Sequence, residues 1–143
     1  MKSIWYQPFT LEALNQRGSG TMTEFLGITF IEIGNDYLKA TMPVNAKTKQ
    51  PLGILHGGAN VVLAESLASV GANVVLNHET HYAVGLEINA NHIRSTSDGL
   101  VMGVTRPLHL GRSTQVWQID IFNEKGDLSC TSRMTAAVME RKR

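Results

Sequence analysis

The stretch GGANVVLAESLASVGANVVL, residues 57–76, decides the fold of this chain. Its apolar residues cover most of the circumference of an α-helix, which is typical of a helix that is buried nearly all round. A carboxylate inside such a helix is costly unless it is paired or used, so we interpret Glu65 as a catalytic group. Ser69 follows four residues later on the same helical face and can hydrogen-bond Glu65 or a water molecule. A solvent-facing Glu65 is the alternative, but its apolar neighbours leave no wide polar stripe.

Strand patterns lie on both sides of this helix. Residues 28–33 and 37–44 flank turn-forming residues and predict a hairpin. Four more strands are predicted after the helix, at residues 81–95, 100–110, 114–122 and 127–139, and Pro107 indicates an edge or a bulge in the second of these. A single curved antiparallel sheet around the helix would bury its apolar surface, so we predict an α+β fold with one domain over residues 1–143.

The two ends of the chain carry weaker signals. Thr10 is predicted to cap a short helix over residues 11–17, which Gly18 ends in the left-handed conformation. A further helical turn is predicted over residues 22–26, and residues 140–143 are interpreted as a solvated tail. The open edges of the predicted sheet invite pairing with a second copy, so we expect a homodimer with a continuous sheet.

Composition excludes several classes of protein. The formal net charge of +1 gives no support to a nucleic-acid partner. The longest apolar stretch is interrupted by polar side chains, and residues 1–8 lack the apolar segment of a signal peptide, so a cytoplasmic protein that does not enter the membrane is expected. The single cysteine, Cys130, cannot form an intrachain disulfide and is interpreted as a buried, inert thiol.

A loop becomes the long helix at His56-Gly57-Gly58. A helix N-terminus presents unpaired N–H groups and a positive dipole, which suit a developing oxyanion, and glycine lets a ligand approach the backbone closely. Tight packing at the helix start would explain the glycines equally well. His56 is the best functional histidine, and no pair of histidines has convincing zinc-ligand spacing, so no metal is predicted.

Two polar segments further along the chain are candidates for binding phosphate. His92 and Arg94 share one face of a predicted strand and have Ser95 beside them. Arg112 and Ser113, after Gly111, could add to that site. An ordinary exposed strand end is an equally good interpretation. The sequence has no phosphate-binding glycine loop and no Gly-x-Ser-x-Gly motif, so serine-hydrolase chemistry has no support.

Six blocks, in this order, resemble the hotdog-fold acyl-CoA thioesterases of the His-Gly-Gly type over nearly the whole chain. The blocks are TKQP (48–51), LHGGA (55–59), VLAES (62–66), GLEINANH (85–92), PLHLG (107–111) and QVWQI (115–119). The resemblance is strongest to the bacterial branch of 1,4-dihydroxy-2-naphthoyl-CoA hydrolases and enterobactin-pathway proofreading thioesterases. It implies hydrolysis of aryl or fused-ring acyl-CoA thioesters, in menaquinone synthesis or with broad specificity.

The resemblance also implies roles for particular residues. Glu65 attacks the thioester or activates water, the Gly57 N–H of a second subunit stabilises the oxyanion, Gln50 and His56 orient the thioester, and Ser69 positions the water. The residues implied in binding substrate and CoA are Gly85, His92, Arg94, Ser95, His109, Gly111, Arg112 and Ser113. Two subunits share each active site, two dimers commonly form a tetramer, and no cofactor is implied.

Three other functions stay open at this point. A hotdog dehydratase or hydratase also pairs a histidine with a helical carboxylate, but the His56-Gly57-Gly58 context argues against it. Thioesters on a carrier protein could replace CoA as substrates. A non-catalytic acyl-CoA-binding module is the third alternative, and the joint presence of Glu65, Gln50 and the glycines argues against it.

Overall fold

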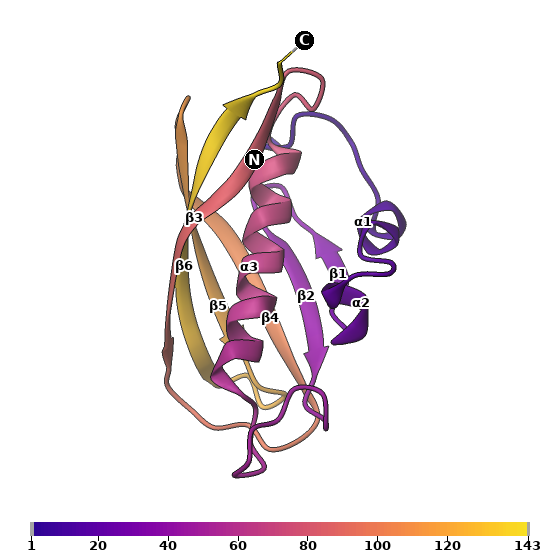
Figure 1. The fold of residues 1–143 in the computed structure, drawn as a ribbon, viewed down its shortest axis with the longest axis vertical. Coiled ribbons are helices and arrows are strands. Elements are labelled where there is room, and N and C mark those ends of the chain that lie inside the picture. Colours follow the sequence, from indigo (N-terminus) through magenta and orange to yellow (C-terminus); the bar gives the residue numbers. More distant parts are fainter. Residues whose placement is uncertain (1, 143) are drawn as a thin grey trace.

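The computed structural model describes residues 2–142, which form one antiparallel sheet with a long helix across one face (Figure 1). The strand order is β1-β2-β4-β5-β6-β3. The elements are α1 (Leu11–Arg17), α2 (Met22–Phe25), β1 (Thr29–Ile33), β2 (Leu38–Pro43), α3 (Gly57–Val74), β3 (His81–His92), β4 (Leu100–Leu110), β5 (Thr114–Phe122) and β6 (Leu128–Glu140). The predicted α+β class, with a curved antiparallel sheet around one long helix, is confirmed.

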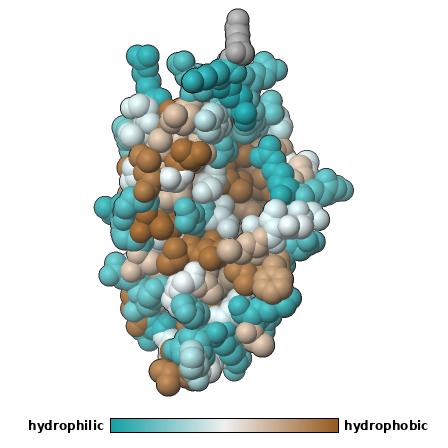
Figure 2. Space-filling view, viewed as in Figure 1, coloured by the Kyte–Doolittle hydropathy of each residue, from teal (hydrophilic) through white to brown (hydrophobic). Residues whose placement is uncertain are grey.

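Helix α3 packs against β2, β3, β4, β5 and β6. From Ala59 to Val74 no residue is fully exposed, as the apolar pattern predicted. The other residues of this stretch are half-buried, and Figure 2 shows apolar side chains gathered across the middle of this face of the molecule. Since every turn of α3 contacts other elements, its position relative to the sheet is fixed along its whole length.

Trp117 of β5 joins the sheet to α3. Its indole N–H donates to the Gln115 side chain (2.8 Å), and the Gln115 amide donates to the Ala72 carbonyl of α3 (3.2 Å). The indole also lies against Gly71, where a Cβ would come within 2.8 Å of the ring. A buried amide and a buried indole thus satisfy each other while they hold the helix in place.

The N-terminal segment forms a second layer beside α3 (Figure 1). Thr10 caps α1 as predicted, because its hydroxyl oxygen accepts from the Ala13 N–H (3.1 Å). The Asn15 side chain both accepts from the Phe30 N–H (2.8 Å) and donates to the Phe30 carbonyl (3.0 Å), which fastens α1 to β1. The prediction for Gly18 was wrong: it is right-handed, with φ −78°, and the left-handed residue is Gly20, with φ 72°.

Several boundaries differ from the sequence-based expectations, by one to three residues. Helix α3 ends at Val74 rather than near residue 76. Strand β3 ends at His92 rather than residue 95, because the N–H groups of Ile93 and Arg94 both turn to the Ser129 carbonyl. Glu140 is the last residue of β6 rather than part of a tail.

The bulge indicated by Pro107 is present, between Pro107 and His109, within a strand that pairs on both sides. Arg141 and Lys142 of the predicted tail are exposed, whereas Arg143 lies outside the described residues. No helix among residues 2–142 is long and apolar enough to cross a membrane.

Cys130 is fully buried in β6, and burial, followed by the negative charge of Asp120, raises the pKa of its thiol to about 11. Since the thiolate is the reactive form, we expect the folded protein to be inert to a chromogenic thiol reagent at neutral pH. After unfolding in denaturant, one thiol per chain should react. Rapid reaction of the folded protein, absent in Cys130→Ala, would contradict this burial.

Candidate active site

Glu65 faces a cavity of about 410 Å³ between α3 and the α1–α2 segment. Its side chain is half-buried, and no hydrogen bond or ion pair is recorded for its carboxylate within residues 2–142. The lining surface is mostly apolar, and twelve residues contribute to it: Leu14, Arg17, Gly18, Thr21, Met22, Thr23, Phe30, Val62, Glu65, Ser66, Ser69 and Val70. An unpaired carboxylate in such a cavity is available for chemistry and is not a structural ion pair.

Gly85 of β3 lies directly against this carboxylate. A Cβ at position 85 would come within 2.9 Å of Glu65 Oε1. Any larger side chain at 85 would therefore displace the carboxylate. The pairing of β3 with β6 has a bulge between Gly85 and Glu87, so β3 bends beside the Glu65 carboxylate.

Ser69 shares the cavity with Glu65, as the four-residue spacing predicted. No hydrogen bond joins the two side chains in the described part of the chain; the Ser69 hydroxyl instead donates weakly to Met134 Sδ (3.8 Å). Both polar groups thus face the same space without contacting each other, which is the arrangement needed to hold a molecule between them.

The N-terminus of α3 presents one free N–H. His56 caps the helix through Nδ1, which accepts from the Gly58 N–H (2.8 Å), so the neutral ring carries its proton on Nε2. Among residues 2–142 no acceptor is recorded for the Gly57 N–H. The helix start therefore offers the Gly57 N–H to a ligand oxygen, in the positive field of the helix N-terminus.

A second cavity, of about 290 Å³, lies at this helix start. It brings together five residues singled out in the sequence: Gln50, Gly57, His92, Arg94 and Ser95. A Cβ at Gly57 would come within 2.7 Å of His92 Nε2, so the ring lies against the helix start. The Gln50 Oε1 accepts from the Leu52 N–H (2.5 Å), which leaves the Gln50 amide N–H groups free for a ligand.

Asn60 also lines this second cavity and was missed from the sequence. Asn60 is 4% exposed, its Oδ1 has no recorded partner in residues 2–142, and its Nδ2 lies 3.3 Å from His92 Nδ1. A polar side chain one turn into an apolar helix was the signal that could have revealed it. A buried acceptor without a donor beside the proposed oxyanion site is expected to bind water or a ligand donor.

The two cavities share no lining residue. Gly57 and Glu65 are eight residues apart in α3, which corresponds to a rise of about 12 Å. The carboxylate and the free N–H of one chain are therefore too far apart to act on the same carbonyl. One chain therefore holds the predicted catalytic carboxylate and the predicted oxyanion donor in separate cavities.

The remaining predicted binding residues lie at the other end of the sheet. Gly111, Arg112 and Ser113 line a hollow with His81, and the exposed His109 packs beside Gly111. Ser113 bonds Val138 of β6, whereas His92 pairs with Cys130 of β6. The eight residues from Cys130 to Val138 of β6 span about 26 Å. Within one chain, residues 92–95 and residues 111–113 are therefore too far apart to bind the same phosphate. No group of three or more potential metal ligands occurs in residues 2–142.

A family model described as the thioesterase superfamily matches residues 52–130, and the chain belongs to this family. The protein is therefore a thioester hydrolase of hotdog fold, as the sequence resemblance implied.

Two of the similar proteins have names that state a reaction or a role. The chain is 58% identical over 136 residues to 1,4-dihydroxy-2-naphthoyl-CoA hydrolase of Escherichia coli K12, covering 95% of this chain and 99% of that protein. It is 49% identical to the proofreading thioesterase EntH of Cronobacter sakazakii, covering 95% and 98%. A solved mutant of thioesterase PA1618 from Pseudomonas aeruginosa superposes with a TM-score of 0.96 at 44% identity, covering 97% of this chain and 100% of that chain.

Proposed function

We propose that this protein hydrolyses aryl or fused-ring acyl-CoA thioesters of the 1,4-dihydroxy-2-naphthoyl type, with Glu65 as the catalytic carboxylate. The observation that carries this proposal is the unpaired Glu65 in a mostly apolar cavity of about 410 Å³. That volume suits a ring system, because small-molecule pockets of roughly 300–1,000 Å³ hold drug-sized ligands. The similarity to a 1,4-dihydroxy-2-naphthoyl-CoA hydrolase supports the same choice and favours a role in menaquinone synthesis.

The proposed reaction needs a group that delivers oxygen to the carbonyl carbon and a donor that stabilises the oxyanion. Glu65 either attacks the carbonyl to form an anhydride, which water then opens, or removes a proton from a water that attacks directly. In both routes the C–S bond breaks, CoA leaves as its thiol, and the acid is released. Gln50, His56 and the Gly57 N–H hold the carbonyl oxygen, and Ser69 positions the water.

Each complete site takes its halves from two subunits. Strand β3 is an edge strand, with Gly85 beside Glu65 and His92 beside Gly57. If β3 pairs antiparallel with β3 of a second copy, the Gly85 end of one strand lies next to the His92 end of the other. Glu65 then faces Gly57 of the partner subunit, which removes the separation found within one chain. Val84 (45% exposed) and Leu86 (62% exposed) supply apolar contacts for this pairing.

The same pairing brings the two CoA-binding groups together. The hollow of Gly111, Arg112 and Ser113 lies at the His81 end of β3. Antiparallel pairing places that end of one subunit next to the His92 end of the other. His92, Arg94 and Ser95 of one subunit, with His109 and the 111–113 segment of its partner, then hold the phosphates and pantetheine of CoA. The predicted cytoplasmic location stays a prediction.

The experiment that tests this function is thiol release from three acyl-CoA substrates: 1,4-dihydroxy-2-naphthoyl-CoA, benzoyl-CoA and a medium-chain acyl-CoA. We expect the largest kcat/KM for the fused-ring substrate. If thiol is released only from aryl thioesters on a carrier protein, the carrier protein replaces CoA as the substrate's thiol in the proposal. Binding without release of any thiol, measured by calorimetry, would instead indicate a non-catalytic acyl-CoA-binding module.

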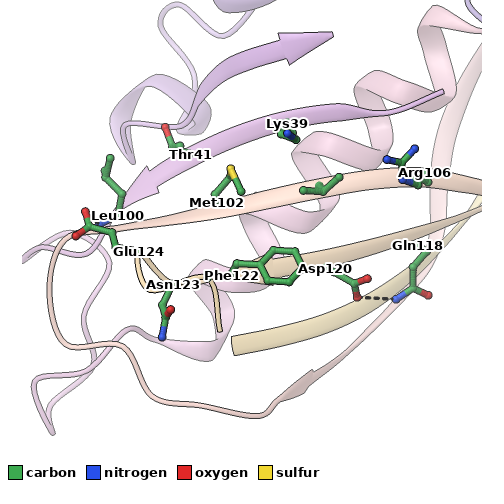
Figure 3. Close-up of a pocket in the computed structure, with 12 residues that line it drawn as sticks. Lys39, Thr41, Leu100, Met102, Arg106, Gln118, Asp120, Phe122, Asn123 and Glu124 are labelled. Atoms are coloured by element: carbon green, nitrogen blue, oxygen red, sulfur yellow. Dashed lines mark hydrogen bonds between the residues drawn. The ribbon is translucent and has the colours of Figure 1, made fainter. Parts of the chain in front are cut away.

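We further propose that two dimers associate through the outer face of the sheet to form a tetramer. A groove of about 720 Å³ crosses β2, β4 and β5 on the face opposite α3. Figure 3 shows Lys39 and Arg106 towards one end, Leu100 and Glu124 at the other, and Met102 and Phe122 between them. A two-fold axis through this apolar centre would set Met102 and Phe122 of one dimer against the same residues of the other.

Phe122→Asp is expected to convert the tetramer to dimers, because it places a charge in the apolar centre of the groove. The site lies on the opposite face of the sheet, so thiol release per subunit should fall by less than about twofold. Light scattering coupled to size-exclusion chromatography gives the mass, and Lys125→Asp, in the exposed β5–β6 turn, is the control. A native protein that is already dimeric would contradict this assembly.

A further inference from the structure

Arg17 introduces a positive charge into the wall of the acyl cavity. It lies in the last turn of α1, whereas Glu65 lies in α3, on another wall of the same cavity. Arg17 and Glu65 are the only charged residues among the twelve that line this cavity. Neither takes part in the two ion pairs found within residues 2–142, which are Lys39–Glu32 and Arg106–Asp36.

This arrangement constrains what can fill the cavity. A guanidinium has five N–H donors and no acceptor, so it requires an oxygen or another acceptor opposite it. Arg17 is exposed, so water supplies that acceptor in the free protein, and no ion pair joins Arg17 to Glu65 within residues 2–142. An acyl group that covers the guanidinium displaces this water, and only an acyl group with an oxygen at that place replaces the lost acceptor.

We propose that Arg17 is a specificity-determining residue that donates hydrogen bonds to an oxygen substituent on the acyl group, at the side distant from the thioester. The ligand class is an aromatic acyl group that carries a hydroxyl or a carboxylate there. The carbonyl lies at Glu65, the ring fills the apolar part of the cavity, and the distal oxygen meets Arg17. This inference rests on the proposed function and adds to it a preference among aromatic acyl groups.

A structural role for Arg17 makes different predictions. An arginine in the last turn of a helix also complements the negative end of the helix dipole. The charge of Arg17 also acts beyond the end of α3: burial, followed by the positive charges of Arg17 and Arg141, lowers the pKa of His78. A role of this kind affects stability and changes the hydrolysis of all substrates alike, whereas recognition of a distal oxygen changes the ratio between substrates.

The test compares benzoyl-, 4-hydroxybenzoyl- and 4-carboxybenzoyl-CoA with the native protein, Arg17→Met and Arg17→Lys. Methionine keeps the length of the side chain and removes its charge. We expect Arg17→Met to lower kcat/KM for the two oxygenated substrates by roughly 10- to 100-fold, mainly through KM, because a hydrogen bond to a charged group is lost. Hydrolysis of benzoyl-CoA should change by less than about twofold, and Arg17→Lys should recover part of the preference.

Arg133→Met, which removes an exposed arginine from β6, is the matched control and should alter no substrate ratio. Equal losses on all three substrates, or a lowered melting temperature with unchanged ratios, would overturn the proposal and leave a structural role. Absence of thiol release from every substrate with the native protein would instead contradict the proposed function. The two failures are therefore distinguishable.

Discussion

Glu65→Gln is expected to lower kcat for acyl-CoA hydrolysis by about 10³-fold or more, with little change in KM. The substitution keeps the shape of the side chain and removes both its negative charge and its ability to take a proton. General-base catalysis alone contributes roughly 10²–10⁴-fold, and a nucleophilic role would add to that loss. No second carboxylate lines the cavity, so no neighbouring group can take over. Thiol release under saturating substrate measures the effect.

Glu87→Gln is the matched control for this variant. Glu87 lies on β3, two residues beyond Gly85, and its exposed carboxylate accepts only from the Asn89 side chain among the described residues (3.1 Å). The same chemical change there should leave kcat within about twofold. If Glu65→Gln remained fully active while folded, the catalytic assignment of Glu65 would be wrong.

Gly57→Pro is expected to lower kcat by roughly 10²–10³-fold, the usual effect of removing one oxyanion donor. Proline lacks the N–H that no described residue uses, yet it suits the first position of a helix. The preceding residue must be extended, and His56 already is, with φ −67° and ψ 132°. The substitution should therefore remove the donor while α3 still forms.

Gly57→Ala is the control that separates the donor from sterics. Both substitutions add a Cβ, which would lie 2.7 Å from His92 Nε2 and displace that ring. Only proline also removes the N–H. The ratio of the two kcat values therefore reports the oxyanion donor, and equal kcat values would show that the N–H has no catalytic role.

The sequence predicted the parts of the site that depend on local pattern. Glu65 and Ser69 share one cavity because a four-residue spacing places them on one helical face. His56 and Gly57 occupy the start of α3 because the glycines mark where the loop ends. The long helix and the six strands follow equally from periodicity, with errors of one to three residues at half of their ends.

The parts that depend on long-range pairing could not be predicted. That Gly85 lies against Glu65 depends on how β3 crosses α3, and that Arg112 lies far from His92 depends on the register of β6 with its neighbours. Asn60 had a local signal, but its role requires the contact with His92. Gly18 was predicted left-handed from residue type alone, whereas the bonds of its N–H to Asn15 and Gln16 keep it right-handed.

Mixing the two inactive variants, Glu65→Gln and Gly57→Pro, tests most directly whether two subunits share each site. In a heterodimer, one site pairs Glu65 from the proline variant with Gly57 from the glutamine variant, and the other site carries both substitutions. After joint unfolding and refolding at equal amounts, random pairing makes half of the dimers mixed, and about one quarter of native activity should return. If mass spectrometry showed mixed dimers but no activity returned, the shared site would be contradicted, and Glu65 and Gly57 would have to act within the same subunit.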